Sequence, residues 1–243
     1  MPARGLILFG AVLAALSLAA CTPKSQQSGD VGPKPNGDAA DIAQALDPCA
    51  EGSGADASLC GNRTLAALDA QIRDALVAEA ASVSESGAQL LVQNQQRWRQ
   101  AQRVACGVTD EAATPDAEQQ SCLEAEFRER VQEARSSIEE VGGYTFQRVE
   151  LVDATPVTAQ IAADSGLGDE APPAVSRDIR YPRIDAPQTP AIQRFNQLVA
   201  QQPQYRLEDA TEEIVDYRIA YAGPDVISVR FDTAIFPWRG PSQ

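Results

Sequence analysis

The chain has 243 residues, with 34 acidic and 20 basic side chains and no histidine, so its formal net charge is −14. This charge argues against nucleic acid as a partner, because binding to phosphates needs basic patches. It suits a cationic partner, since opposite charges speed up encounter, although solubility alone also accounts for it. The lack of histidine excludes histidine-based catalytic triads and the commonest metal ligand.

The first 20 residues have the pattern of a bacterial export signal. Arg4 is followed by an apolar run from Gly5 to Leu16 and then by small residues. The run is too short for a bilayer core of about 30 Å, which needs about 20 apolar residues. The segment Leu18-Ala19-Ala20-Cys21 resembles the lipobox of bacterial lipoproteins, in which the cysteine accepts lipid, palmitate included. We therefore expect a lipoprotein signal peptide at 1–20 and lipidation at Cys21. An ordinary secretory signal with a chance cysteine is the alternative.

Lipid at Cys21 would hold the mature chain on a membrane, since each buried methylene contributes about 0.8 kcal/mol. Thr22, rather than Asp, follows the cysteine. By resemblance to Gram-negative lipoproteins this implies the outer membrane, facing the periplasm. Residues 21–45 are rich in Gly, Pro, Ser and Asp, which predicts a disordered tether between membrane and folded part.

Four cysteines remain when Cys21 is set aside: Cys49, Cys60, Cys106 and Cys122. An even number in an exported chain predicts disulfides. Three pairings are possible, and proximity along the sequence favours Cys49–Cys60 and Cys106–Cys122. A zinc site made of four thiolates is the rival interpretation, but neither pair has the spacing of about two to four residues typical of zinc knuckles.

Residues 46–142 have helical periodicity. One helix is expected after Asn62 as N-cap, a second from about Ser86 to Ala105, and a third from about Asp116 to Gly142-Gly143. The apolar stripe of the third comprises Phe127, Val131, Ala134, Ile138 and Val141. Burying these stripes against one another predicts an antiparallel helical bundle.

Residues 143–243 mix strand and helix patterns. Strands are expected at 144–154 and 175–184, with Pro182 marking an edge or a bulge. Thr189 and Pro190 predict a short helix. Two further strands, 212–223 and 225–236, follow, and alternation in the second turns Ile227, Val229, Phe231 and Thr233 to the core. The predicted fold class is α+β: a disulfide-bonded antiparallel helical bundle followed by a small α+β domain.

The helical region, from about 49 to 140, resembles the N-terminal family of the lysozyme inhibitor LprI. Three segments carry the resemblance: "DPCAEGSGADASLCGNRTLAALDAQI", "LLVQNQQRWRQAQRVAC" and "SCLEAEFRER". In that family a polar-Trp-Arg helix leads into a cysteine, and a second Cys-Leu opens the last helix. The resemblance covers under half of the mature chain and implies a lysozyme as the partner.

A weaker resemblance covers about 175–236. The segments "RYPRIDAPQTPAIQRFNQLV" and "YRIAYAGPDVISVRFDTAIF" are similar to the opening of the extracellular domain of lysozyme-sensing anti-sigma factors and peptidoglycan deacetylases. Such domains continue into a turn with Gly and His and further elements, whereas this chain ends at "PWRGPSQ". We therefore expect either an incomplete domain or a resemblance that stops here.

The leading hypothesis is a non-enzymatic envelope lipoprotein that binds a protein or cell-wall ligand, and both resemblances point towards a lysozyme, which would be cationic. The alternative is a scaffold or binding module whose ligand is peptidoglycan or another envelope component. Glu208-Asp209 and Glu212-Glu213 are candidate contacts only in the sense that every exposed acidic pair is one. We interpret them as solvent-exposed edges of a strand or helix. Trp98 lies on an apolar stripe, which favours core packing over a ligand platform, and Trp238 is left unassigned.

Catalysis is not expected. Glycoside hydrolysis needs two carboxylates at a fixed separation, and no acidic pair lies in a recognisable motif. Ser228 lacks the G-x-S-x-G context of a nucleophile. We therefore predict no catalytic residues, no metal and no cofactor.

Overall fold

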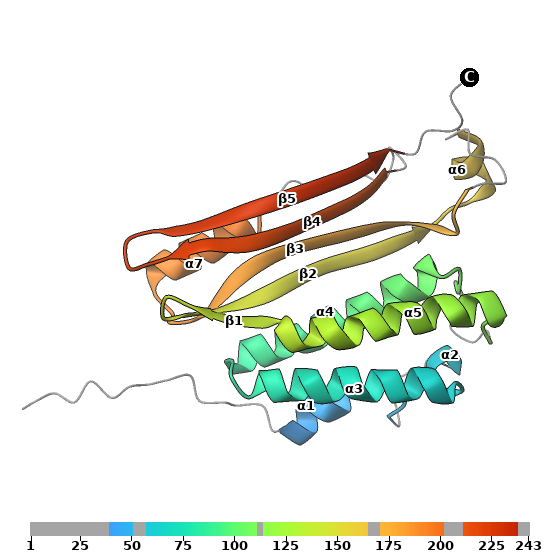
Figure 1. Ribbon diagram of the computed structural model, residues 1–243, viewed down its shortest axis with the longest axis horizontal. Coiled ribbons are helices and arrows are strands. Elements are labelled where there is room, and N and C mark those ends of the chain that lie inside the picture. Colours follow the sequence, from blue (N-terminus) through green and yellow to red (C-terminus); the bar gives the residue numbers. More distant parts are fainter. Residues whose placement is uncertain (1–38, 51–56, 111–113, 165–170, 202–210, 238–243) are drawn as a thin grey trace, which may run out of the picture. The chain divides into compact units, whose positions relative to one another are not determined.

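The computed structural model shows an α+β protein in which helices accompany a five-stranded mixed sheet (Figure 1). The structure describes residues 39–50, 57–110, 114–164, 171–201 and 211–237. All of them belong to one compact unit. The predicted signal peptide, Cys21, Glu208-Asp209 and Trp238 lie outside these ranges. The predicted α+β class is confirmed, as are both predicted disulfides.

Three long helices begin close to their predicted starts. They are α3 (Arg63–Ala80), α4 (Glu85–Ala105) and α5 (Ala117–Glu133). The side chains of Asn62, Ser84 and Asp116 accept hydrogen bonds from the first free N–H groups of these helices. The apolar stripes of the helices share one core, whose larger members are Leu65, Ile72, Leu76, Leu91, Trp98, Leu123 and Phe127.

A short helix, α1 (Ala39–Leu46), precedes them, and a single turn, α2 (Ala57–Cys60), leads into α3. Residues 39–45 of the expected tether are therefore helical. Arg99 of α4 holds α1 in place by donating a hydrogen bond to the carbonyl oxygen of Leu46. The same guanidinium pairs with the buried carboxylate of Asp69 on α3 at 2.8 Å, so one side chain joins three helices.

The third helix ends earlier than predicted. After α5 comes a short 3-10 turn, η1 (Ala134–Ser136), and then Ile138–Val141 form strand β1 instead of a last helical turn. Gly142 and Gly143 have φ values of 62° and 82° and form the two-residue turn of a β-hairpin. The glycine pair fits a helix C-cap and a hairpin turn equally well, and pairing with the next strand decides between them.

The sheet has the order β1-β2-β3-β4-β5. Its other strands are β2 (Tyr144–Pro156), β3 (Ala174–Ala186), β4 (Thr211–Ala222) and β5 (Ile227–Pro237). Neighbours are antiparallel except β3 and β4, which are parallel. Helix α6 (Ala159–Asp164) lies between β2 and β3 along the chain, and α7 (Pro190–Val199) lies between β3 and β4.

The predicted strands and the predicted helix α7 are confirmed. Thr189 caps α7 by accepting from the N–H of Ile192. Pro182 lies in β3 beyond the residues Arg177–Ile179 that pair with β4. In β5, the predicted core positions up to Phe231 are half-buried, but Thr233 is exposed.

Helix α4 covers the edge of β2 beyond its pairing with β1 (Figure 1). The amide of Asn94 donates from Nδ2 to the carbonyl oxygen of Arg148 at 2.9 Å and accepts from the N–H of Glu150 at 3.2 Å. One turn later, Arg97 donates to the carbonyl oxygen of Glu150 at 3.1 Å. These side chains supply the hydrogen bonds that a neighbouring strand would make. They also place one face of α4 beside the sheet.

Candidate functional site

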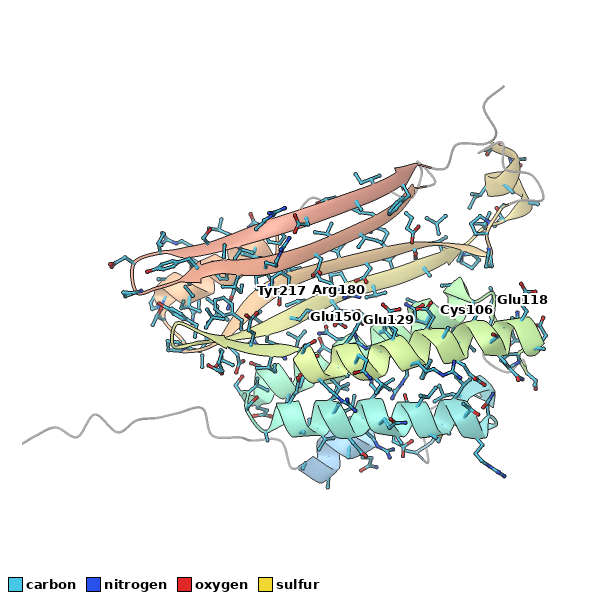
Figure 2. All side chains as sticks on the ribbon, in the orientation of Figure 1. Cys106, Glu118, Glu129, Glu150, Arg180 and Tyr217 are labelled. Atoms are coloured by element: carbon cyan, nitrogen blue, oxygen red, sulfur yellow. A yellow bond between two sulfur atoms is a disulfide. The ribbon has the colours of Figure 1, made fainter. Side chains whose placement is uncertain are left out.

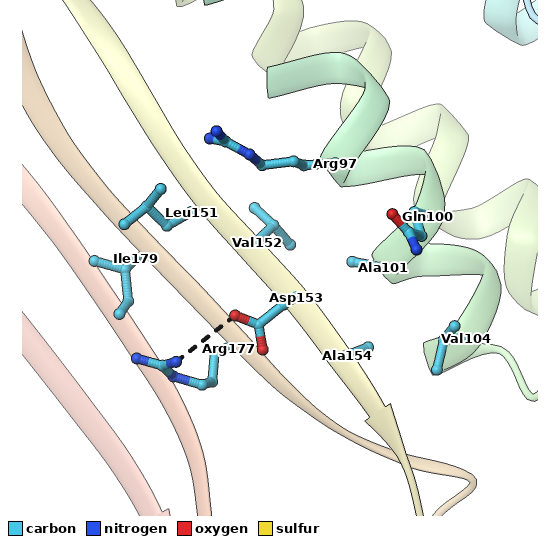
Figure 3. A pocket seen from close by; sticks show the side chains of 10 residues that line it. All are labelled: Arg97, Gln100, Ala101, Val104, Leu151, Val152, Asp153, Ala154, Arg177 and Ile179. Carbon is cyan, nitrogen blue, oxygen red and sulfur yellow. Dashed lines mark ion pairs between the residues drawn. The ribbon is translucent and has the colours of Figure 1, made fainter. Parts of the chain in front are cut away.

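A cavity of about 420 Å³ lies between the second half of α4 and strands β2 and β3 (Figure 3). This volume is within the range of small-ligand sites, about 300–1,000 Å³. Arg97, Gln100, Ala101 and Val104 line it from one face of α4, because residues three and four apart lie on the same side of a helix. The side chain of Ala101 is small and leaves the space open.

Charged groups lie at the two ends of the cavity and apolar ones between them. Figure 3 shows Arg97 at one end, Arg177 with Asp153 at the other, and Leu151 and Ile179 in between. Arg97 is oriented by its hydrogen bond to the edge of β2. The cavity therefore presents two guanidinium groups, which bind carboxylates and phosphates in a planar, two-pronged geometry.

Arg177 lies between two carboxylates without a well-formed hydrogen bond to either. Its Nη1 is 3.7 Å from Oδ2 of Asp153, and its Nε is 3.5 Å from Oε2 of Glu213. Within the described part of the chain, Nε and Nη2 of Arg177 and both carboxylate oxygens of Glu213 are buried without a hydrogen-bond partner. Buried polar atoms are normally paired, so this cluster retains unused hydrogen-bonding capacity beside the cavity.

Asp153 is the accessible carboxylate of the cluster, with about half of its side chain exposed. Burial raises the pKa of Asp153, and the charge of Arg177 opposes the rise. An arginine and an accessible carboxylate at the same end of the cavity could hold a ligand that carries both an acidic and a basic group.

A second charged cluster joins the helices to the sheet through Glu150 of β2, which Figure 2 labels. Arg130 of α5 binds both carboxylate oxygens of Glu150, its Nε donates to Gln95, and its guanidinium lies 5.3 Å from the ring centre of Trp98. Burial alone would raise the pKa of Glu150, but Arg130 holds it below its usual value. Since these charges are paired and enclosed, we assign this cluster to stability rather than to binding.

The acidic face, defined as Glu126, Glu129 and Glu133 of α5, is the third charged feature, and within it Glu133 is also paired with Arg180 at 2.8 Å. The spacing of three and four places the α5 residues on one side of that helix. Burial, followed by repulsion from Glu129 and Glu133, raises the pKa of Glu126. Glu129 is exposed. The acidic face offers negative charge to a cationic partner.

The outcome for the predicted site residues is mixed. The cysteine pairs are confirmed, with Cα–Cα distances of 5.8 Å for Cys49–Cys60 and 5.7 Å for Cys106–Cys122. Trp98 is buried against Phe127, as predicted.

The interpretation of Glu212-Glu213 as a solvated pair is wrong. Glu213 is 1 % exposed and faces Arg177, while Glu212 accepts a hydrogen bond from the hydroxyl of Ser176. The parallel pairing of β3 with β4 brings Glu213 opposite Arg177. The sequence predictions also missed Arg97, Asp153 and Arg177. The position of Arg177 could have been inferred from the sequence. It lies two residues before Ile179 in a predicted strand, so both side chains point to the same side of that strand.

Within the described ranges, no group of three or more His, Cys, Asp or Glu side chains could hold a metal ion. Among those same residues, no helix is long and apolar enough to cross a membrane. Comparison with protein-family models, curated proteins and solved structures finds no match for this chain.

Proposed function

We propose that this chain is a non-enzymatic binding protein of the bacterial envelope, anchored by lipid at Cys21, with a cationic lysozyme as its partner. The observation that carries the proposal is the acidic face. Burial and then repulsion between its carboxylates raise the pKa of Glu126, and clustered charge steers an oppositely charged protein towards its binding surface. The two disulfides support an oxidising compartment such as the periplasm.

In the same proposal, the helical region 46–142 is the part related to the LprI N-terminal family. Deleting Tyr144–Gln243 would not test this assignment. Glu150 and the sheet against which α4 packs lie in the deleted part, so the deletion would remove the main partner of Arg130 and uncover one side of the helical core. Substitutions on the surface of the intact chain are the better test.

The test measures inhibition of a c-type lysozyme in a cell-wall turbidity assay and its binding by calorimetry. Replacing Glu126 and Glu129 by Gln should slow association several-fold at low salt. A control variant removes the same charge elsewhere, with Asp74→Asn and Glu85→Gln at exposed positions, and should bind nearly as the unmodified chain does. Absence of inhibition and of binding would overturn the proposal, and an equal loss in both variants would overturn the role of the acidic face.

The cavity favours a second candidate, a binding module whose ligand is an envelope component other than lysozyme. Arg97 and Arg177 suit a small ligand with a carboxylate, such as a peptide fragment of peptidoglycan. Such fragments should bind the full chain in calorimetry and bind Arg97→Gln more weakly. The control Arg218→Gln makes the same change at an exposed position on β4 outside the cavity lining. Failure of these fragments to bind the unmodified chain would exclude this candidate.

A further inference from the structure

The outer edge of the sheet at β5 differs from the edge at β2. Within the described residues, β5 is the last strand and no element pairs with its outer side. Its interior carries neither lysine nor proline, two residues that commonly protect exposed edges. Large apolar side chains are exposed at both ends of this edge, with 58 % of Val226, 41 % of Ile235 and 51 % of Phe236 accessible.

The sequence of β5 is complementary to itself when reversed. If two copies lie antiparallel about a twofold axis at Phe231, each residue faces a chemically compatible one. The pairs are Val226 with Phe236, Ile227 with Ile235, Ser228 with Ala234, Val229 with Thr233, Arg230 with Asp232, and Phe231 with itself. The apolar residues at one end of the edge thus meet those at the other end, and each arginine meets an aspartate.

We propose that β5 is a homodimer interface, in which two copies of this chain join their sheets edge to edge in this register. The occupant of the edge is therefore a second copy. Backbone hydrogen bonds across the new strand pair and burial of Val226, Ile235 and Phe236 provide the affinity. Copies related by a twofold axis present the same surface to each other, so a reversed, self-matching strand is the pattern this arrangement requires.

Charge selects the register. If the twofold axis passes through Arg230 instead, the arginines of the two copies face each other. If it passes through Asp232, the two aspartates face each other. Both arrangements are destabilising, because like charges lie directly opposite. Along a strand, the backbone N–H and C=O groups of successive residues point alternately towards the free edge and towards β4. A slip by one residue therefore places residues whose groups point to the free edge opposite residues whose groups point away from it, and the hydrogen bonds are lost. Of these registers, only the one centred on Phe231 pairs opposite charges and bonds the backbone.

Asp232 can pair with Arg230 of the second copy and still keep its hydrogen bonds within its own chain. It accepts hydrogen bonds from Arg218 at 2.9 Å and Arg230 at 2.7 Å within the chain. About 42 % of its side chain and 65 % of that of Arg230 remain exposed, and a carboxylate offers about four acceptor positions. Exposed ion pairs contribute little affinity, so the Arg230–Asp232 contacts discriminate between registers rather than hold the dimer together.

The first experiment traps the register. In the full chain carrying Cys21→Ser, Ser228→Cys and Ala234→Cys are made separately, mixed and mildly oxidised. Opposed residues lie with Cβ atoms about 4.5–5.5 Å apart, close to disulfide distance. The mixture should therefore give a cross-linked dimer, whereas either variant alone should not.

Thr233→Cys mixed with Ser228→Cys is the matched control, because residue 233 points to the opposite face of the strand. Equal cross-linking in this control mixture, or none in the test mixture, would overturn the proposal.

The second experiment exchanges the charges and measures self-association by sedimentation up to about 100 µM. Arg230→Asp sets a new carboxylate against Asp232 of the other copy and should weaken the dimer about tenfold. Adding Asp232→Arg restores opposite charges and should recover most of the loss. Arg194→Asp, at an exposed position on α7, makes the same charge change and should have little effect.

A chain that stays monomeric at the highest concentration would overturn the proposal and leave the edge to another partner. A double exchange that does not recover dimerisation would overturn the register, and the proposal with it.

Discussion

The guanidinium of Arg130 on α5 binds both carboxylate oxygens of Glu150 on β2, at 3.0 and 2.7 Å, and each side chain is 1 % exposed. The two residues lie 20 positions apart in the sequence and belong to different kinds of structure. Their pairing connects the helical core to the sheet through a fully enclosed ion pair.

We expect Glu150→Gln to lower the free energy of unfolding by about 3 kcal/mol, because it leaves the buried charge of Arg130 with only Glu133, at 3.3 Å, as its counter-charge. Replacing both residues, as Arg130→Met with Glu150→Leu, should cost less than Glu150→Gln alone. Urea unfolding followed by circular dichroism measures both. If Glu150→Gln were as stable as the unmodified chain, the Arg130–Glu150 pair would not be buried as described.

A second prediction concerns pH and Glu79 of α3. Burial raises its pKa to about 7, although the N–H of Ser137 donates to the carboxylate. Between about pH 4.5 and pH 7 the folded chain holds a proton on Glu79 that the unfolded chain, in which the glutamate has its ordinary pKa of 4.5, has released. The contribution of Glu79 to stability is therefore lost as the pH rises through this range.

Glu79→Gln should remove this part of the pH dependence and raise the melting temperature at pH 8 relative to the unmodified chain. Thermal unfolding across pH 5 to 8 measures it, with Glu85→Gln, at an exposed position, as the control. An unchanged pH profile in Glu79→Gln would show that this carboxylate is already ionised in the folded chain at neutral pH.

Asn94 provides a third prediction, because its amide takes the place of a strand at the edge of β2. Asn94→Ala should cost about 1–3 kcal/mol, since the carbonyl of Arg148 and the N–H of Glu150 lose their partner. Asn94→Asp should cost at least as much, because at a position only 2 % exposed it buries a carboxylate that cannot donate to the carbonyl oxygen of Arg148. Hydrogen exchange of the Glu150 amide should speed up in Asn94→Ala, and slow exchange there would mean that another group closes the edge.

The two glycines of the β1–β2 turn offer a matched pair of substitutions. Both have positive φ, so alanine at either position is strained by about 1–2 kcal/mol. A Cβ at Gly142 would also collide with the backbone of Ala222, whereas one at Gly143 would meet nothing within 4 Å. We therefore expect Gly142→Ala to lower the melting temperature clearly more than Gly143→Ala. Equal effects would show that the hairpin moves away from Ala222 easily.

Local features of the sequence were predictable because they depend on neighbours in the chain. The cap at Asn62, the start of α7 at Thr189 and both cysteine pairs follow from residues a few positions apart. The end of the third helix was not, because Ile138 and Val141 satisfy helical spacing and only pairing with β2 makes them a strand. The partners of Arg177 were hidden for the same reason: Glu213 reaches it through the parallel pairing of β3 with β4.

The hold of Arg99 on the end of α1 has a mechanical consequence. A force that pulls on the chain from before Ala39 would first unwind α1, whose eight residues extend to at most roughly 30 Å. The load would then reach Leu46, held by Arg99, and Asp47, paired with Arg73 at 3.1 Å. Beyond them, the covalent link between Cys49 and Cys60 prevents the residues between these cysteines from being drawn out. Tension applied from this end would thus release one short helix and leave the core formed by α3, α4 and α5 in place.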